Sequence, residues 1–192
     1  MSGKSSRKNK VKFNIKNVHY AMRKEDETGY ETPVPIPGAV SITLEAQGEL
    51  SPFYADGIKY HVSSSNGGYE GDLEMALIPD IFRTDVLGEE TDTNNVMIED
   101  ANAPTREFAL GFDIDGDFKT TRFWFWNCTA TRPSTESSTT EDKKDPTTDK
   151  LSVSCAPCTD GKVRAKTTES TPQEIYNNWY TEVYAPVFNT AV

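Results

Sequence analysis

The sequence predicts a mainly β fold, a β-sandwich or barrel with one short internal helix, long loops and a short C-terminal helix. Three observations support it. Short segments with apolar residues at every second position recur between turn residues. The stretch 107–132 has the pattern of a β-hairpin around Asp115-Gly116. A helical period occurs only at 79–87 and 172–184. Strand-rich chains of this kind bury their apolar faces sheet on sheet.

The length of 192 residues suits one domain, or one domain with long arms. The hydrophobic fraction is 35% and the mean hydropathy is -0.62, which is lean for a compact globule, so we expect much of the chain to be loop, arm or ordered only in an assembly. We divide it into a flexible basic arm (1–16), a single β domain (17–184) and a C-terminal tail (185–192). The net charge of -10 argues against a general nucleic-acid-binding surface.

The start of the chain is basic but has no apolar run behind it, unlike a signal peptide, and no stretch is long and apolar enough for a membrane span. Three cysteines fit a reducing compartment better than a disulfide framework. We therefore expect a protein that is made and kept in the cytoplasm, unless it leaves inside a larger particle.

The first half of the chain alternates strands and loops. Val11–Met22 is predicted as a strand with Val11, Phe13 and Ile15 on one face, and 23–38 as a Pro-rich linker or surface arm. Ala39–Glu45 follows as a strand.

Residues 48–57 are interpreted as a turn, because the aromatic residues Phe53 and Tyr54 are out of step with any long strand. Ile58–Val62 and Tyr69–Ile78 are predicted strands. Pro79–Leu87 is predicted as a short helix that Gly88 ends.

A short strand at Val96–Glu99 precedes the central hairpin, which has two possible registers. A two-residue turn pairs Ile114 with Asp117, and a three-residue loop pairs Phe112 with Phe118. We favour the second, which puts one apolar set on a single face: Phe108, Leu110, Phe112, Phe118, Trp124 and Trp126. In either register Phe123 and Phe125 point the other way, so this strand needs cover on both faces, from the chain's own core or from another subunit.

The last third begins with a polar stretch, 133–150, which is either disordered or an extended polar hairpin. Leu151–Ala156 and Lys162–Thr167 are predicted strands. Pro172–Tyr184 is predicted as a helix, with Thr171 and Glu174 forming a capping box.

No motif points to chemistry. Cys155 and Cys158 have the spacing of a metal-binding knuckle or of a redox-active pair. However, a zinc site needs four ligands, and a redox-active pair needs a helix N-terminus that lowers the pKa of the thiol. The acidic stretch 113–117 lacks the glycine and glutamate positions of a calcium loop. His19 and His61 have no partners of a catalytic triad. We therefore predict no catalytic, cofactor-binding or metal-binding residues, no cofactor and no enzyme. The net negative charge fits either a solvated surface or a surface that must lie beside DNA without binding it.

Five blocks in order resemble the major tail proteins of long non-contractile-tailed phages, the phi13-like family. They are NVHYA (Asn17–Ala21), PVPIPGAVSITLEAQGELSPFYADGIKY (Pro33–Tyr60), GYEGDLEMALIPDIFRTDVLGE (Gly68–Glu89), NCTATRPSTESSTTEDK (Asn127–Lys143) and TPQEIYNNWYTEVY (Thr171–Tyr184). The resemblance implies a tail-tube-type sandwich flanked by the helix at 79–87. It implies hexameric rings that stack around a DNA channel in the virion tail, assembled in the host cytoplasm with tape-measure, tail-tip and tail-terminator proteins.

Two sets of candidate residues follow. Acidic residues on or beside strands are candidates for the channel lining: Glu45, Glu49, Asp72 and Glu74. Aromatic residues are candidates for subunit interfaces: Phe53, Tyr54, Phe123 and Phe125. We expect the N-terminal arm, 47–60 and 133–150 to contact other subunits or rings. The alternative is a β-sandwich adhesion or decoration domain on a particle surface.

Overall fold

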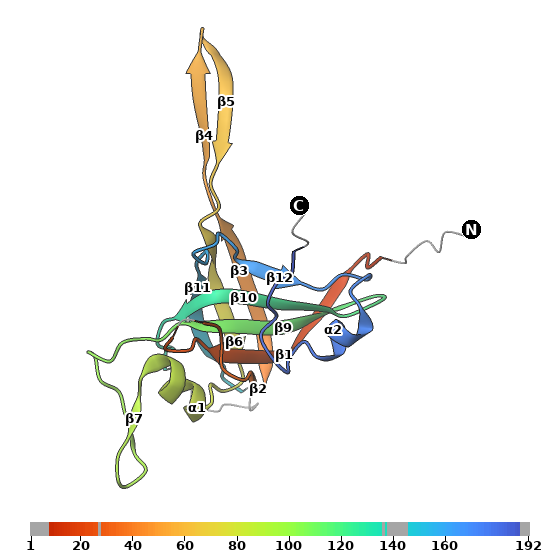
Figure 1. The fold of residues 1–192 in the computed structure, drawn as a ribbon. Helices are drawn as coiled ribbons and strands as arrows, with labels where there is room; N and C mark the ends of the chain where they lie inside the picture. The colour runs from red at the N-terminus through yellow and green to blue at the C-terminus, as the bar shows by residue number, and fades with distance from the viewer. Residues whose placement is uncertain (1–7, 27, 136, 138–145, 189–192) are drawn as a thin grey trace, which may run out of the picture.

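A computed structural model describes residues 8–26, 28–135, 137 and 146–188 (Figure 1). The fold is mainly β, with a large antiparallel sheet and few helices, as the sequence predicts. The elements in chain order are β1 (Lys12–Met22), β2 (Val34–Ile36), β3 (Ala39–Gln47), β4 (Leu50–Ala55), β5 (Ile58–Ser64), β6 (Gly68–Met75), α1 (Asp80–Phe82), a π-type turn (Arg83–Leu87), β7 (Glu90–Thr91), β8 (Met97–Ile98), β9 (Phe108–Gly116), β10 (Thr121–Ala130), β11 (Asp149–Cys155), β12 (Arg164–Lys166) and α2 (Gln173–Asn177).

The large sheet has the strand order β2-β1-β9-β10-β11-β6-β3, and β12 pairs with β10 beside this path. The sheet folds over on itself, so that β3 and β6 run steeply across β1, β9 and β10 (Figure 1). Side chains from both parts meet in one core, for example Leu110 and Phe112 of β9, Leu73 of β6 and Leu151 of β11. Two packed layers around a common apolar core are a sandwich.

The predicted register of the central hairpin is wrong. Phe112 pairs with Phe123, because the pair nearest the turn joins Ile114 to Thr121 and leaves the longer segment 115–120 between them. Asn9 holds this longer loop, with its Oδ1 accepting hydrogen bonds from the backbone N–H of Phe118 and of Lys119 at 3.0 and 2.9 Å. The pairing differs from the prediction by an odd number of residues, which exchanges the two faces of β10.

As a result Phe123 and Phe125 share the main core with Phe112, while Trp124 and Trp126 lie on the other face and Phe118 is exposed. The prediction that β10 is covered on both faces is confirmed, and the cover comes from the chain itself. Trp179 packs over Trp124, whose Nε1–H donates to the Trp179 carbonyl at 2.9 Å.

The internal helix lies where it is predicted, after Pro79, and Gly88 ends it in the left-handed region with φ 72°. The C-terminal helix is much shorter than predicted. Thr171 does not cap it, since Pro172 occupies the N-cap position and the Thr171 hydroxyl accepts from the Thr168 N–H at 2.8 Å. The chain leaves the helix after Asn177 and buries Trp179 against the sheet.

The N-terminal region also differs from the prediction. Residues 12–16, assigned to the arm, lie in β1, and Phe13 is exposed while Val18 and Tyr20 supply the buried face. Asn17 has a positive φ of 58° within an irregular part of the β1–β9 ladder, which shifts the alternation. Part of the Pro-rich linker forms the edge strand β2, where Pro35 can sit because one side of an edge strand needs no donor.

Some predictions fall outside the described residues. They concern 1–7 of the basic arm, 27 of the Pro-rich linker, 136 and 138–145 of the polar stretch, and 189–192 of the C-terminal tail. The described end of that stretch, from Asp149, belongs to β11.

Candidate functional site: an apolar hairpin beside an acidic sheet face

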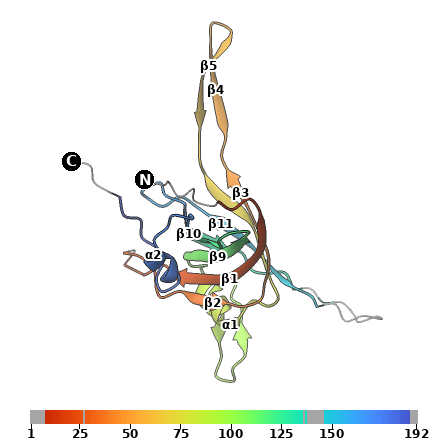
Figure 2. The same cartoon turned by 90° about the vertical axis from the view of Figure 1, so that its right-hand side faces the viewer.

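Strands β4 and β5 form a hairpin that points away from the body in both views (Figures 1 and 2). Asp56 and Gly57 at its tip both have positive φ, 51° and 76°, as in the tight turns that match strand twist. Among the described strands, β4 and β5 pair only with each other. An isolated two-stranded hairpin is at best marginally stable in water, so this one needs a partner surface.

The hairpin exposes large apolar side chains without a core behind them. Their exposed fractions lie between 41% and 73%, and the residues are Leu50, Phe53, Tyr54, Ile58, Tyr60 and Val62, here called the hairpin surface. Contiguous exposed apolar surface of this kind is typical of interaction sites.

Both faces of the hairpin carry apolar groups. Residues directly opposite in a ladder share a face, so Phe53 lies with His61 on one face and Pro52 with Val62 on the other. The ladder then skips Tyr60, since Phe53 pairs with His61 and Tyr54 with Lys59. A bulge therefore places one extra residue in β5. Phe53 and Tyr54 are consecutive residues of β4 and lie on opposite faces, and both side chains are exposed, so no single buried face imposes a regular alternation. The interpretation of 48–57 as a turn is wrong, because Leu50–Ala55 forms strand β4 and only the end of the stretch lies in the tight turn.

The hairpin continues the β3–β6 ladder outward. The Gly67 N–H donates to the Gln47 carbonyl at 2.6 Å, and the Ser65 N–H donates to the Glu49 carbonyl at 3.0 Å. These bonds fix the base of the hairpin relative to the outer face of β3, β6 and β11.

That outer face is acidic. In β6 the side chains of Tyr69, Leu73 and Met75 face the core, so the alternate acidic residues point outward. The register places Thr43 and Ser152 on either side of Asp72 in one row. The acidic face comprises Glu45, Glu70, Asp72 and Glu74, with Lys150 among them.

Two of these carboxylates are held in the ionised form. Lys150 Nζ lies 2.9 Å from Asp72 Oδ2 and the Ser152 hydroxyl donates to Asp72 Oδ1 at 2.9 Å, which lowers the pKa of Asp72 below its usual value. Thr148 and Ser41 donate to Glu74 at 2.6 and 2.8 Å and lower its pKa in the same way. Donors to a carboxylate favour the charged form.

Glu45 and Glu70 are directly opposite each other in the β3–β6 ladder. Like charges at opposed positions destabilise a sheet. The fold does not need this pair, so a role outside the fold is the better explanation of the acidic face.

The structure separates the candidate residues into groups. Glu45, Asp72 and Glu74 share the acidic face, to which the structure adds Glu70, and Glu49 lies apart at the hairpin base. Phe53 and Tyr54 are on the hairpin surface, whereas Phe123 and Phe125 are buried in the chain's own core. Glu70 could have been found from the alternation in Tyr69–Met75, but the hairpin surface had no such signal.

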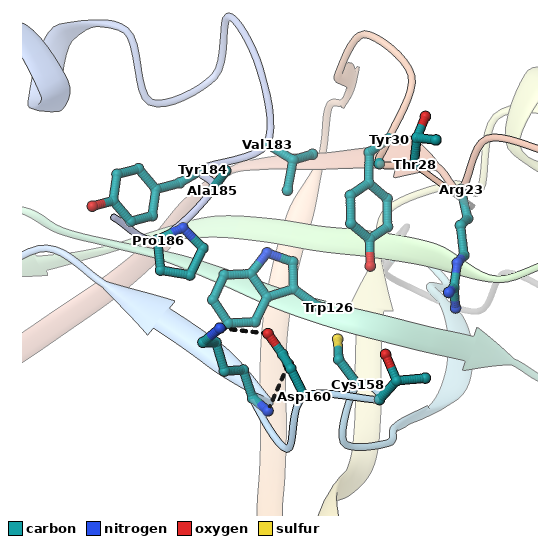
Figure 3. A pocket seen from close by; sticks show the side chains of 13 residues that line it. Arg23, Thr28, Tyr30, Trp126, Cys158, Asp160, Val183, Tyr184, Ala185 and Pro186 are labelled. Atoms are coloured by element: carbon teal, nitrogen blue, oxygen red, sulfur yellow. Dashed lines mark hydrogen bonds and ion pairs between the residues drawn. The ribbon is translucent and has the colours of Figure 1, made fainter. Parts of the chain in front are cut away.

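A shallow pocket of about 310 Å³ lies on the other face of the body (Figure 3). Trp126, Tyr30 and Cys158 line it, and burial raises the pKa of the Cys158 thiol, which disfavours the nucleophilic thiolate. Asp160 is paired with Lys162. The described residues contain no cluster of side chains fit to hold a metal ion, and none of their helices could span a membrane. The C-terminal segment, with Val183, Tyr184 and Pro186, forms part of the lining of this pocket.

Comparison with known proteins completes these observations. A family model described as phage tail tube protein matches residues 13–192. No curated protein matches the chain.

Proposed function

The chain belongs to the phage tail tube protein family, and we propose that its copies close into hexameric rings that stack into a tube around the genome channel. The protein is a structural component of the virion tail. We further propose that it acts by self-assembly and has no catalytic activity.

The observation that carries this proposal is the hairpin surface. Its apolar residues lie on both faces of a two-stranded element that pairs with no other described strand. Burying such groups against a second copy is the favourable free-energy term of association. The hairpin is therefore the segment that contacts the next ring.

A second group of exposed apolar side chains surrounds α1 and β7–β8, at the opposite end of the body from the hairpin (Figures 1 and 2). These residues are Leu77, Ile81, Val96 and Ile98. Two different surfaces at opposite ends suit head-to-tail association, which produces open stacks rather than closed dimers. This end is the proposed receiver of the hairpin from the next ring.

Ring closure is proposed to come from sheet joining. Among the described ladders, β3 pairs only with β6 and leaves its other edge unpaired. Free strand edges invite pairing with another chain, and a closed ring of joined sheets removes them. Such a ring would place the acidic face of every subunit toward the channel.

An acidic channel suits passage of DNA without binding. Carboxylates repel phosphates and offer no cation whose pairing would release counterions, which is the main source of nonspecific affinity for DNA. DNA therefore passes through the tube without sequence-specific contacts. Tape-measure, tail-tip and tail-terminator proteins are proposed to set the length and ends of the tube, and assembly is placed in the host cytoplasm.

Negative-stain electron microscopy of the purified protein over a range of concentrations tests the proposal. Rings or open-centred tubes are expected, alone or after addition of a tail-tip complex. Protein that stays monomeric under both conditions would favour the adhesion or decoration domain instead.

A further inference from the structure

We propose that Cys128 and Cys155 form a reversible disulfide across the β10–β11 ladder, outside the assembly function described above. In the sequence, Cys155 and Cys158 are the two cysteines with the spacing of a redox-active pair. The structure instead brings Cys155 to Cys128, with the two sulfur atoms 2.8 Å apart. That separation is roughly 0.8 Å longer than a disulfide bond.

The backbone geometry of the pair is suitable. Cys128 and Cys155 are directly opposite in an antiparallel ladder. The neighbouring pair is hydrogen-bonded, since the Ala156 N–H donates to the Asn127 carbonyl at 3.1 Å, so Cys128 and Cys155 occupy a non-hydrogen-bonded position. Cα atoms there are about 4.5 Å apart, within the range that a disulfide spans. A small rotation of the two side chains closes the bond without moving the strands.

Cys158 is not an alternative partner in this fold. The Cys128 and Cys155 side chains belong to the main core, whereas Cys158 packs with Trp126 on the opposite face of the sheet. The Cys158 N–H donates to the Lys162 carbonyl at 2.8 Å, which fixes the loop that carries it. Pairing Cys155 with Cys158 would require Cys155 to leave the core.

The disulfide would lie where the two layers of the sandwich are joined. The β10–β11 ladder is short, with Cys128–Ala130 paired and one backbone hydrogen bond beyond each end, and it joins the layer of β1, β9 and β10 to the layer that carries the hairpin. A covalent bond at this short ladder ties the two layers together and limits the freedom of the unfolded chain.

The oxidant would be a small disulfide such as glutathione disulfide. A thiolate of one cysteine attacks it, forms a mixed disulfide and expels one glutathione thiolate. The second cysteine attacks the protein sulfur and expels the other, so two protein thiols lose two electrons and both protons pass to glutathione. Both sulfurs are buried and burial raises the pKa of Cys128, so the reaction is slow and needs local opening. The thiols persist in a reducing cytoplasm and the bond forms in an oxidising medium.

The test uses the full-length protein, purified under reductant and then incubated for days with glutathione disulfide. After unfolding and alkylation with N-ethylmaleimide, trypsin should release a linked pair of peptides, 123–143 and 151–162, because cleavage does not occur before Pro133. Fragmentation should place the link at Cys155 and the alkyl group on Cys158.

Variants complete the test. Cys158→Ser is expected to form the same link, whereas Cys155→Ala and Cys128→Ala should not. The oxidised wild type should unfold at a temperature higher by roughly 5 °C or more than the reduced protein, and the Cys155→Ala variant should not respond to oxidant. Three fully alkylated cysteines after prolonged oxidation, or a link to Cys158, would overturn the proposal.

Discussion

Replacing Phe53 by alanine should weaken tube assembly without weakening the folded subunit. A phenylalanine side chain has about 200 Å² of surface, and Phe53 is 62% exposed. Close to 120 Å² is thus available for burial against a neighbour, of which alanine would retain about a third. At about 25 cal/mol per Å², the variant loses roughly 2 kcal/mol for each hairpin contact.

A loss of roughly 2 kcal/mol corresponds to about a 30-fold weaker contact. In a ring the loss repeats in every subunit, so the concentration at which tubes appear should rise by at least this factor. The assay is sedimentation of assembled tubes over a concentration series, with thermal unfolding of the unassembled subunit in parallel. The unfolding temperature should not change, since Phe53 is absent from the buried clusters.

Phe118→Ala is the matched control. Phe118 is also an exposed aromatic residue, at the end of the central hairpin and away from β4–β5. It should assemble like the wild type. Equal assembly of Phe53→Ala and the wild type would refute the assignment of the hairpin as the ring-to-ring contact.

Other expectations concern stability, charge and pH. Trp179→Ala should cost about 3–5 kcal/mol of unfolding free energy by guanidinium titration, because it uncovers Trp124, and a red shift of tryptophan fluorescence should accompany it. Gly71→Ala should prevent normal folding, as judged by circular dichroism, because its Cβ would collide with the Thr43 carbonyl oxygen. Gly57→Ala meets no atom in the described structure, so its cost should be limited to about 1–2 kcal/mol of backbone strain at a φ of 76°. A Glu70→Lys/Asp72→Lys double variant, if it assembles, should bind DNA in filter assays at low salt and release it at high salt, whereas unchanged weak binding would argue against the acidic channel. The pKa of Asp72 is lower in the folded chain than in the unfolded chain, so its contribution to stability is present above the unfolded value near 4 and is lost as the pH falls through the folded value. Asp72→Asn should remove that part of the acid dependence, and an unchanged profile would count against the Lys150 and Ser152 contacts.

The local pattern of the sequence predicts most strands, because alternation at positions such as Leu73 and Met75 reports directly on a buried face. It could not predict the register of the central hairpin. The loop length that sets the register depends on Asn9, which is far away in the chain and binds the loop through its side chain. Long-range contacts of this kind leave no local periodicity.

The C-terminal helix and the hairpin surface show the same limit in different ways. The pattern at Thr171 and Glu174 is that of a capped helix, but burial of Trp179 against Trp124 ends the helix after Asn177. In the described structure the large apolar side chains of β4 and β5 are exposed, so they follow no single face, and the bulge at Tyr60 breaks the remaining alternation. Of the candidate site, the sequence pointed to the acidic residues on β3 and β6 and to Phe53 and Tyr54, but it did not predict the strand β4 that carries these two aromatic residues.

We propose that the hairpin surface joins one ring to the next while the acidic face lines the channel. Cryo-electron microscopy of assembled tubes, at a resolution that traces β4 and β5, tests it most directly. We expect stacked rings, with Phe53 and Tyr60 buried against the adjacent ring and Asp72 facing the lumen. Tubes in which the hairpin projects into solvent, or in which the acidic face lies on the outside, would contradict it.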